Sequence, residues 1–307
     1  MKIFHTIVIS AAITLAAIFS ACGQKQKTAG DELPLLAVSI EPQRWLLDQI
    51  VGNRAEVIAF LPGDANPENF DPPMSALKDA SDAKIYMQMG HLPWETGLIE
   101  RIRQSNKDIT VVDTSLGIDF ITGTHGHDHD HGTGEGHDHG DEEIDPHTWS
   151  SVRNAKIIAA NMAAAVAEAD TANAVYYYTN LGALQARLDS LDRYITKTLA
   201  PYSGKSILVW HPSLSYFARD YGLEQTSIGM ENKESSVSGL KSRLDKAAAG
   251  GSRVFFVQPQ MDGERSAQIA AQTGARMSVI HPLAYDFAGE MRALADAIAD
   301  TTATVTQ

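Results

Sequence analysis

A strand, a helix and a second strand follow one another in residues 35–63, LLAVSIEPQRWLLDQIVGNRAEVIAFLPG. The apolar run from Leu35 to Ile40 predicts a buried strand, and residues 57–61 predict another before the Pro62-Gly63 turn. Residues 42–50 predict a helix, because their apolar side chains recur at helical spacing. Strands that alternate with helices imply a parallel sheet with helices on its faces.

The same alternation continues along the chain. We predict further strands at 85–89, 110–112, 206–210, 224–228, 253–257 and 277–280. We predict further helices at 73–80, 94–103, 145–169, 171–199, 213–221, 237–249, 264–273 and from 287 onward. The expected fold class is therefore α/β, with two lobes, each a parallel sheet flanked by helices, joined by a long rigid backbone helix.

The expected joining helix carries one continuous apolar stripe. Its members keep a three-to-four residue spacing: Leu181, Leu184, Leu188, Leu191, Ile195 and Leu199. We therefore expect an N-terminal lobe at 33–170, a linking helix at 171–200 and a C-terminal lobe at 201–307. Ligands of open α/β sheets bind outside the carboxyl ends of the strands, so the cleft between the lobes is the expected site.

The N-terminus predicts export. Lys2 precedes an apolar stretch from Ile7 to Phe19, which is short for a membrane span and typical of a signal peptide covering 1–21. Cys22 follows Phe19-Ser20-Ala21, as in a bacterial lipobox, and is the only cysteine of the chain. We expect Cys22 to be lipidated, with 22–32 as a tether to the membrane of the cell envelope, periplasmic or at the cell surface.

The charge of the chain argues against nucleic-acid binding. The formal net charge is −13, and removal of the signal peptide takes away Lys2 and no acidic residue. An acidic protein is a poor ligand for phosphate backbones. The mature chain is long enough for one large or two ordinary domains, and we expect a monomer.

A histidine-rich tract occupies residues 124–143. It contains seven acidic residues, five glycines and six histidines: His125, His127, His129, His131, His137 and His139. Because the tract has nothing to bury, we expect a mobile surface loop. Imidazole and carboxylate together favour zinc and similar divalent ions, so these histidines are expected to form weak secondary metal sites.

Other candidate ligands stand at predicted strand ends. His211 and His281 each follow a strand, and His147 opens the helix predicted at 145–169, where the helix dipole would favour its neutral form. Glu68 lies in the turn after the strand at 57–61. Each alone is more typical of a core histidine or a solvated carboxylate, but together they favour a site.

The order of these motifs resembles the zinc and manganese group of solute-binding lipoproteins of ABC importers. Two motifs of that family match closely, Asp145-Pro146-His147-Thr148-Trp149 and His211-Pro212-Ser213-Leu214-Ser215-Tyr216-Phe217. Zinc-specific members also carry a His/Asp-rich loop before the first of these, where this chain has residues 124–143. The resemblance implies capture of a metal ion and its delivery to a membrane permease.

Two positions depart from the family pattern. Glu68 stands where the family usually has His, and His281-Pro282-Leu283 stands where it usually has Asp-Pro-Leu. We interpret the pair as a compensated exchange that leaves Glu68, His147, His211 and His281 as metal ligands. This set favours tetrahedral Zn²⁺, with Mn²⁺ as the alternative. His91 has no ligand position in the family and is expected at the cleft rim, or as a substitute for Glu68.

Two other functions remain open from the sequence. One is an exported zinc-dependent hydrolase with Glu68 as general base, although neither His-Glu-x-x-His nor Gly-x-Ser-x-Gly occurs in the chain. The other is a metal-buffering surface lipoprotein that depends on the histidine-rich loop. A carrier differs from a zinc enzyme because four protein ligands leave no position for an activated water.

Overall fold

The first lobe contains a four-stranded parallel sheet. The computed structural model of the protein describes residues 33–63, 65–123, 144–229, 237–259 and 263–300. The strands are β1 (Leu35–Val38), β2 (Glu56–Ala59), β3 (Ile85–Gln88) and β4 (Thr110–Asp113), in the order β2-β1-β3-β4. Leu36 of β1 pairs with Val57 on one side and Ile85 on the other. The helices of this lobe are α2 (Glu41–Val51), α3 (Met74–Asp79) and α4 (Glu95–Ser105), with a 3₁₀ turn at Ala80–Asp82.

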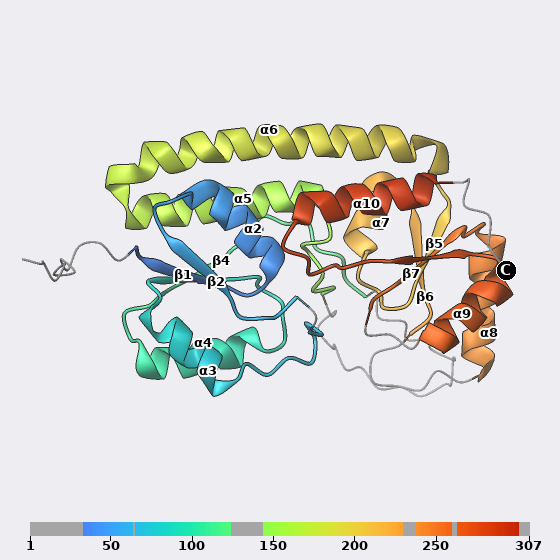
Figure 1. The fold of residues 1–307 in the computed structure, drawn as a ribbon, viewed down its shortest axis with the longest axis horizontal. Coiled ribbons are helices and arrows are strands. Elements are labelled where there is room, and N and C mark those ends of the chain that lie inside the picture. The colour runs from blue at the N-terminus through green and yellow to red at the C-terminus, as the bar shows by residue number, and fades with distance from the viewer. Residues whose placement is uncertain (1–32, 64, 124–143, 230–236, 260–262, 301–307) are drawn as a thin grey trace, which may run out of the picture. The chain divides into compact units, whose positions relative to one another are not determined.

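The second lobe repeats this arrangement. Its strands are β5 (Ser206–Val209), β6 (Glu224–Ser227), β7 (Val254–Val257) and β8 (Arg276–Val279), in the order β6-β5-β7-β8 and all parallel. Its helices are α7 (Ser215–Tyr221), α8 (Val237–Ala249), α9 (Gly263–Thr273) and α10 (Phe287–Ala299). Figure 1 shows the two sheets with helices packed around each. The predicted fold class is confirmed.

The first lobe ends with α5 (Val152–Ala169), and the long helix α6 (Ala174–Leu199) connects it to the second lobe, with 3₁₀ turns at Thr171–Asn173 and Ala200–Tyr202. At about 1.5 Å per residue, α6 is roughly 39 Å long and extends over both lobes (Figure 1). It packs against α2 and α5 of the first lobe and against α10 of the second. The predicted stripe is buried from Leu184 to Leu199, and Leu181 is partly buried against the core.

Hydrogen bonds tie α6 to both lobes. Asn180 donates to the carbonyl of Ile50 at 2.9 Å, and the Tyr194 hydroxyl donates to Asp296 at 2.5 Å. One apolar core cluster includes residues of both sheets. The helix is therefore part of the core of each lobe rather than a free linker.

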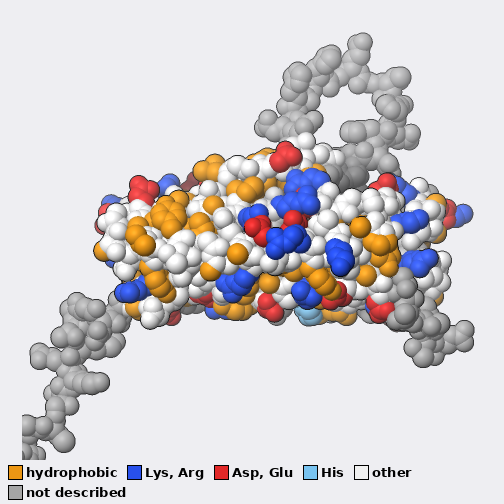
Figure 2. Space-filling model, turned by 90° about the horizontal axis from the view of Figure 1, so that it is seen from above, with side chains coloured by type: hydrophobic (Ala, Val, Ile, Leu, Met, Phe, Trp, Pro, Cys, Tyr) orange, Lys and Arg blue, Asp and Glu red, His pale blue; other side chains and the backbone are white. Residues whose placement is uncertain are grey.

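Charged side chains of both signs lie side by side near the middle of the face above α6 (Figure 2). Arg153 and Lys156 of α5 pair with Asp192 and Asp189 of α6 at 3.3 and 2.5 Å. Such partly exposed pairs contribute little stability, typically below about 1 kcal/mol. In the described part of the chain, no helix combines the length and apolarity needed to cross a bilayer.

The structure corrects one predicted helix. The helix expected from Asp145 begins at Val152, and Ser151 caps it by accepting the N–H of Asn154 at 3.0 Å. Residues 145–150 instead lie in irregular structure with a turn at Thr148 and Trp149, and the Asp145 carboxylate accepts hydrogen bonds from His147 there. His147 therefore does not lie at a helix N-terminus, and the dipole argument for its neutral form was wrong.

Candidate metal centre

Glu68 enters the site from the turn that follows β2. Its backbone N–H donates to the Asn66 side chain at 2.9 Å, which tightens the turn. The indole of Trp94 donates to the carbonyl of Pro67 at 2.9 Å. The Glu68 side chain is only 8 % exposed, and neither of its carboxylate oxygens has a hydrogen-bond donor. A buried carboxylate without donors is costly unless a positive charge accompanies it.

His147 is fully buried and its ring is oriented by Asp145. The Asp145 carboxylate accepts the backbone N–H of His147 at 2.9 Å and lies 2.8 Å from the ring Nδ1. A carboxylate at Nδ1 holds the proton there, which leaves Nε2 with a free lone pair. Burial alone would raise the pKa of the Asp145 carboxyl, but its hydrogen bonds and charge interaction with His147 outweigh burial and lower it.

His211 comes from the second lobe, two residues beyond the end of β5. β5 lies where the strand order of its sheet reverses, the usual place for a ligand in an open α/β sheet. Burial lowers the pKa of the His211 imidazole, although the neighbouring Glu68 carboxylate acts in the opposite direction. The neutral form, which is the metal-binding form, is therefore favoured.

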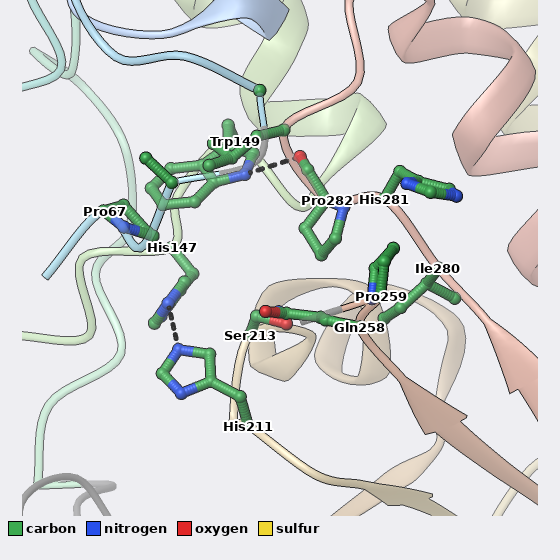
Figure 3. Close-up of a pocket in the computed structure, with 13 residues that line it drawn as sticks. Pro67, His147, Trp149, His211, Ser213, Gln258, Pro259, Ile280, His281 and Pro282 are labelled. Carbon is green, nitrogen blue, oxygen red and sulfur yellow. Dashed lines mark hydrogen bonds between the residues drawn. The ribbon is translucent and has the colours of Figure 1, made fainter. Parts of the chain in front are cut away.

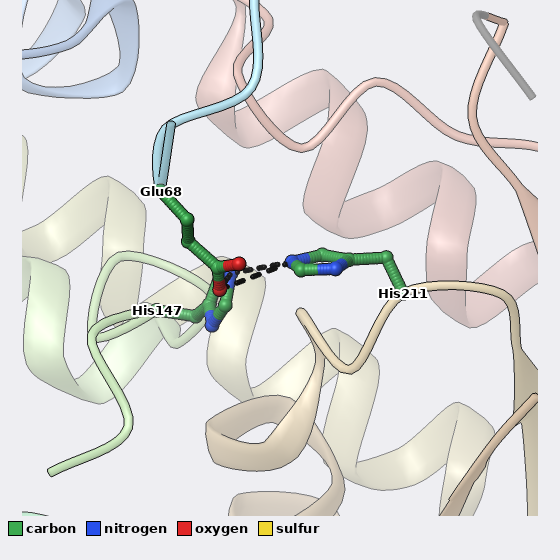
Figure 4. A group of neighbouring side chains, drawn as sticks. All are labelled: Glu68, His147 and His211. Carbon is green, nitrogen blue, oxygen red and sulfur yellow. Dashed lines mark hydrogen bonds and ion pairs between the residues drawn. The ribbon is translucent and has the colours of Figure 1, made fainter. Parts of the chain in front are cut away.

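The three side chains converge on one point from three segments (Figure 4). Glu68 Oε1 lies 3.3 Å from His147 Nε2 and 3.4 Å from His211 Nε2, and the two Nε2 atoms are 2.9 Å apart. Ligand atoms on a tetrahedral zinc ion, at bonds of about 2.0 Å, are separated by about 3.3 Å. The triangle of donor atoms thus has the dimensions of one face of a zinc coordination shell.

This group also needs a cation for electrostatic reasons. While both rings are neutral and the His147 proton is on Nδ1, at most one proton, on His211 Nε2, is available to the three converging atoms. That proton can form a hydrogen bond with only one of the other two atoms at a time. A divalent ion would satisfy all three atoms at once. Glu68, His147 and His211 are the only such group among the described residues.

A cavity of about 440 Å³ adjoins the group. His147 and His211 form part of its wall with Trp149, Gln258 and His281 (Figure 3). The wall thus combines residues of both lobes, as expected for a cleft between them. Two of the three proposed ligands, His147 and His211, therefore face this cavity.

His281 is not brought to the other three candidates. It lies on the cavity wall, with its ring directed away from His147 and His211 in Figure 3. His281 follows β8, whereas His211 follows β5, and β7 lies between these two strands. At the usual strand spacing, the ends of β5 and β8 are therefore about 10 Å apart. The backbone N–H of His281 donates to Glu290 at 2.7 Å, and the Trp149 indole donates to the next carbonyl, Pro282, at 3.0 Å.

The remaining candidates lie elsewhere. His91 packs edge-on against Phe120, with ring centroids 4.5 Å apart, and belongs neither to the metal-binding group nor to the cavity wall. The weak-site histidines of 124–143, Cys22 and the signal peptide lie outside the described residues. The ends of the tract are nevertheless close, because Thr122 and Ile144 form an antiparallel bridge.

Sequence reasoning missed Asp145 as the residue that orients His147. The signal was present, since an acidic residue two positions before a histidine can reach both its backbone N–H and its ring. Trp94, which binds the Glu68 turn from a distant segment, carried no such local signal.

Comparison with known proteins gives a consistent result. The family described as "ZnuA: Zinc-uptake complex component A periplasmic" matches residues 36–301. The high-affinity zinc uptake system protein ZnuA of Bacillus subtilis is 26 % identical over 286 residues, covering 89 % of this chain and 88 % of that protein. The manganese ABC transporter substrate-binding lipoprotein PsaA of Streptococcus anginosus is 24 % identical over 285 residues, covering 89 % and 87 %. A crystal structure of ZnuA superposes with a TM-score of 0.77 at 30 % identity, covering 87 % of this chain and 98 % of the other.

Proposed function

Because this chain belongs to the ZnuA family of periplasmic zinc-uptake components, we propose that it captures a divalent transition metal ion in the cell envelope and delivers it to an ABC permease. The metal is its cargo, with Zn²⁺ as the first candidate and Mn²⁺ as the alternative. The observation that carries the proposal is the convergence of Glu68, His147 and His211 within 3.4 Å, with too few protons to satisfy them.

Glu68, His147 and His211 are the proposed ligands, and His281 is the proposed fourth. His281 shares the cavity wall with both histidines, but its loop would have to turn for the ring to reach the ion. Without that movement the fourth position belongs to water or to the second oxygen of Glu68. Two or three imidazoles with one carboxylate suit zinc better than manganese, which prefers more oxygen ligands.

The position of Glu68 supports a carrier over a hydrolase. Its Oε1 lies at nearly equal distances from the two ring nitrogens, at one corner of the ligand triangle. A carboxylate that binds the ion directly cannot also act as general base for a water on that ion. We therefore propose that the protein makes and breaks no covalent bond.

The location and anchoring of the protein belong to the same proposal. We infer a signal peptide at 1–21, a lipid on Cys22, a tether at 22–32 and a monomer that presents the lobes at 33–170 and 201–307 on either side of the helix at 171–200. A Cys22→Ser variant should move from the membrane fraction to the soluble envelope fraction. Retention in the membrane fraction would contradict the lipid anchor.

The test of the function is a zinc titration of the purified protein in competition with a chelating indicator, together with elemental analysis. We expect the protein to bind one equivalent of zinc tightly. We expect its affinity for manganese to be lower than its affinity for zinc. If no tight equivalent of either metal is found, the proposed function is wrong.

A further inference from the structure

The turn that carries Glu68 is contacted by the side chain of Trp94, which comes from a different segment of the chain. The Trp94 indole N–H donates to the carbonyl of Pro67 at 2.9 Å, in a buried position. The Trp94 ring also meets the ring of Phe70 edge-on, with centroids 5.2 Å apart and an angle of 78° between planes. Trp94 thus contacts the chain on both sides of Glu68, one residue before it and two residues after it.

Trp94 is itself held firmly. It immediately precedes α4, and its carbonyl accepts the N–H of Leu98 at 2.9 Å. The next residue, Glu95, is 2 % exposed and its carboxylate accepts backbone N–H groups of Met89, Gly90 and Leu92 at 2.5, 2.8 and 3.3 Å. The Ser39 hydroxyl, directly after β1, also donates to Glu95. These bonds attach the start of α4 to the carboxyl edge of the first sheet.

The Glu68 carboxylate is held differently, since its Oε1 lies 3.3 and 3.4 Å from the ring nitrogens of the proposed ligands His147 and His211. No backbone N–H donates to either oxygen, and in the metal-free protein the loss of hydration opposes its burial. Its described neighbours in the turn belong to no helix or strand, and the local hydrogen bonds run from Glu68 N–H to the Asn66 side chain at 2.9 Å and from Ala65 N–H to the Pro62 carbonyl at 3.0 Å. The backbone of the turn must therefore be fixed by contacts other than those of the carboxylate itself.

We propose that Trp94 is a positioning residue for metal binding, which holds the Glu68 carboxylate at its place in the ligand triangle before the ion arrives. Pre-organised ligands bind more tightly because less conformational freedom is lost on binding. This inference rests on the proposed function, since it assigns Trp94 an effect on metal affinity that is exerted through Glu68.

The test is a double-mutant cycle between Trp94 and Glu68. Trp94→Phe keeps an aromatic ring against Phe70 and removes the indole N–H together with part of the fused ring. Loss of one buried hydrogen bond should weaken zinc binding by about three- to tenfold in the otherwise native protein. In a Glu68→Ala background the same change should have no further effect, because the residue it positions is gone. A weaker indicator extends the measurement to the Glu68→Ala proteins.

Trp45→Phe is the matched control. Trp45 makes a ring contact with Phe287, 5.9 Å between centroids, and belongs neither to the metal-binding group nor to the cavity wall. We expect it to leave zinc affinity unchanged, and we expect Trp94→Phe and Trp45→Phe to change the melting temperature of the metal-free protein by similar small amounts.

Two results would overturn the inference while leaving the proposed function intact. One is native zinc affinity in Trp94→Phe. The other is an equal loss of affinity with and without Glu68, which would show a general structural role. Absence of tight zinc binding in the unmutated protein would instead reject the proposed function, and this inference with it.

Discussion

Nε2 of His147 lies 2.9 Å from Nε2 of His211, although the two residues are 64 positions apart and belong to different lobes. Neither lobe alone can form this pair. His147 is oriented by Asp145, whereas His211 is presented at the reversal point of the second sheet. The site is therefore assembled only when the lobes are packed together along α5 and α6.

Replacement of Glu68 by Ala should have opposite effects on affinity and on stability. We expect zinc affinity to fall by about a hundredfold or more, because one charged ligand is lost. The metal-free protein should melt at the same or a higher temperature, since a buried carboxylate without donors is removed. Asn69→Ala, at an exposed neighbour, is the control. Unchanged zinc affinity would exclude Glu68 as a ligand.

Asp145→Asn should weaken zinc binding while all proposed ligands remain. The amide cannot hold the Nδ1 proton of His147 as a carboxylate does, and loss of such a partner typically costs about 10- to 100-fold in metal affinity. Asp119→Asn is a suitable control, because Asp119 is exposed. Zinc competition titrations measure the effect, and equal affinities in the two variants would show that Asp145 does not support the ligand.

His281→Ala distinguishes a site with three protein ligands from one with four. If the loop turns on binding, we expect a loss of about tenfold in zinc affinity, smaller than the loss caused by His211→Ala. His91→Ala is the matched control, since that ring packs against Phe120 outside the site. A His281→Ala protein with native affinity would mean that water or Glu68 fills the fourth position.

The histidine-rich tract can be replaced by a short turn, because the residues that flank it already lie close together. Thr122 and Ile144 already pair as a bridge, and Asp145 N–H donates to the carbonyl of Ile121 at 2.9 Å. Replacement of 124–143 by Asn-Gly leaves a three-residue loop, a common length for such a connection. We expect calorimetry to find the tight zinc equivalent retained and the weaker ones lost. Loss of the tight equivalent would make the tract the main binding element.

Glu95 should make stability depend on pH in the acidic range. Burial raises its pKa to about 6, despite the hydrogen bonds it accepts. The folded protein therefore holds this proton more tightly than the unfolded chain does. The contribution is fully present below about pH 4.5 and is lost as the pH rises through 6, a fall of about 2 kcal/mol in the free energy of unfolding.

The Glu95→Gln variant isolates this contribution, because it cannot titrate. Denaturant titration between pH 4.5 and 7 measures the unfolding free energy of both proteins. The value for the native protein minus that for the variant should fall by about 2 kcal/mol as the pH rises. A difference that is constant across this range would contradict the raised pKa.

Local patterns were sufficient for most of the fold. Apolar strands, helical spacing and the stripe of α6 depend on residues close in sequence, so both parallel sheets and the long helix were predicted before any contact was known. The start of α5 was misplaced by seven residues, because Asp145 was read as the first helical residue while its carboxylate in fact binds His147.

The metal-binding group shows where prediction from sequence ends. Motif and resemblance were enough to select Glu68, His147, His211 and His281 as candidates. Only the tertiary structure brings three of them within 3.4 Å and leaves His281 on the cavity wall, because distances between segments depend on strand order and lobe packing. The sequence determined which side chains could bind a metal, since ligand chemistry belongs to the residue. The fold decided which of them meet, since proximity belongs to the packing of distant segments.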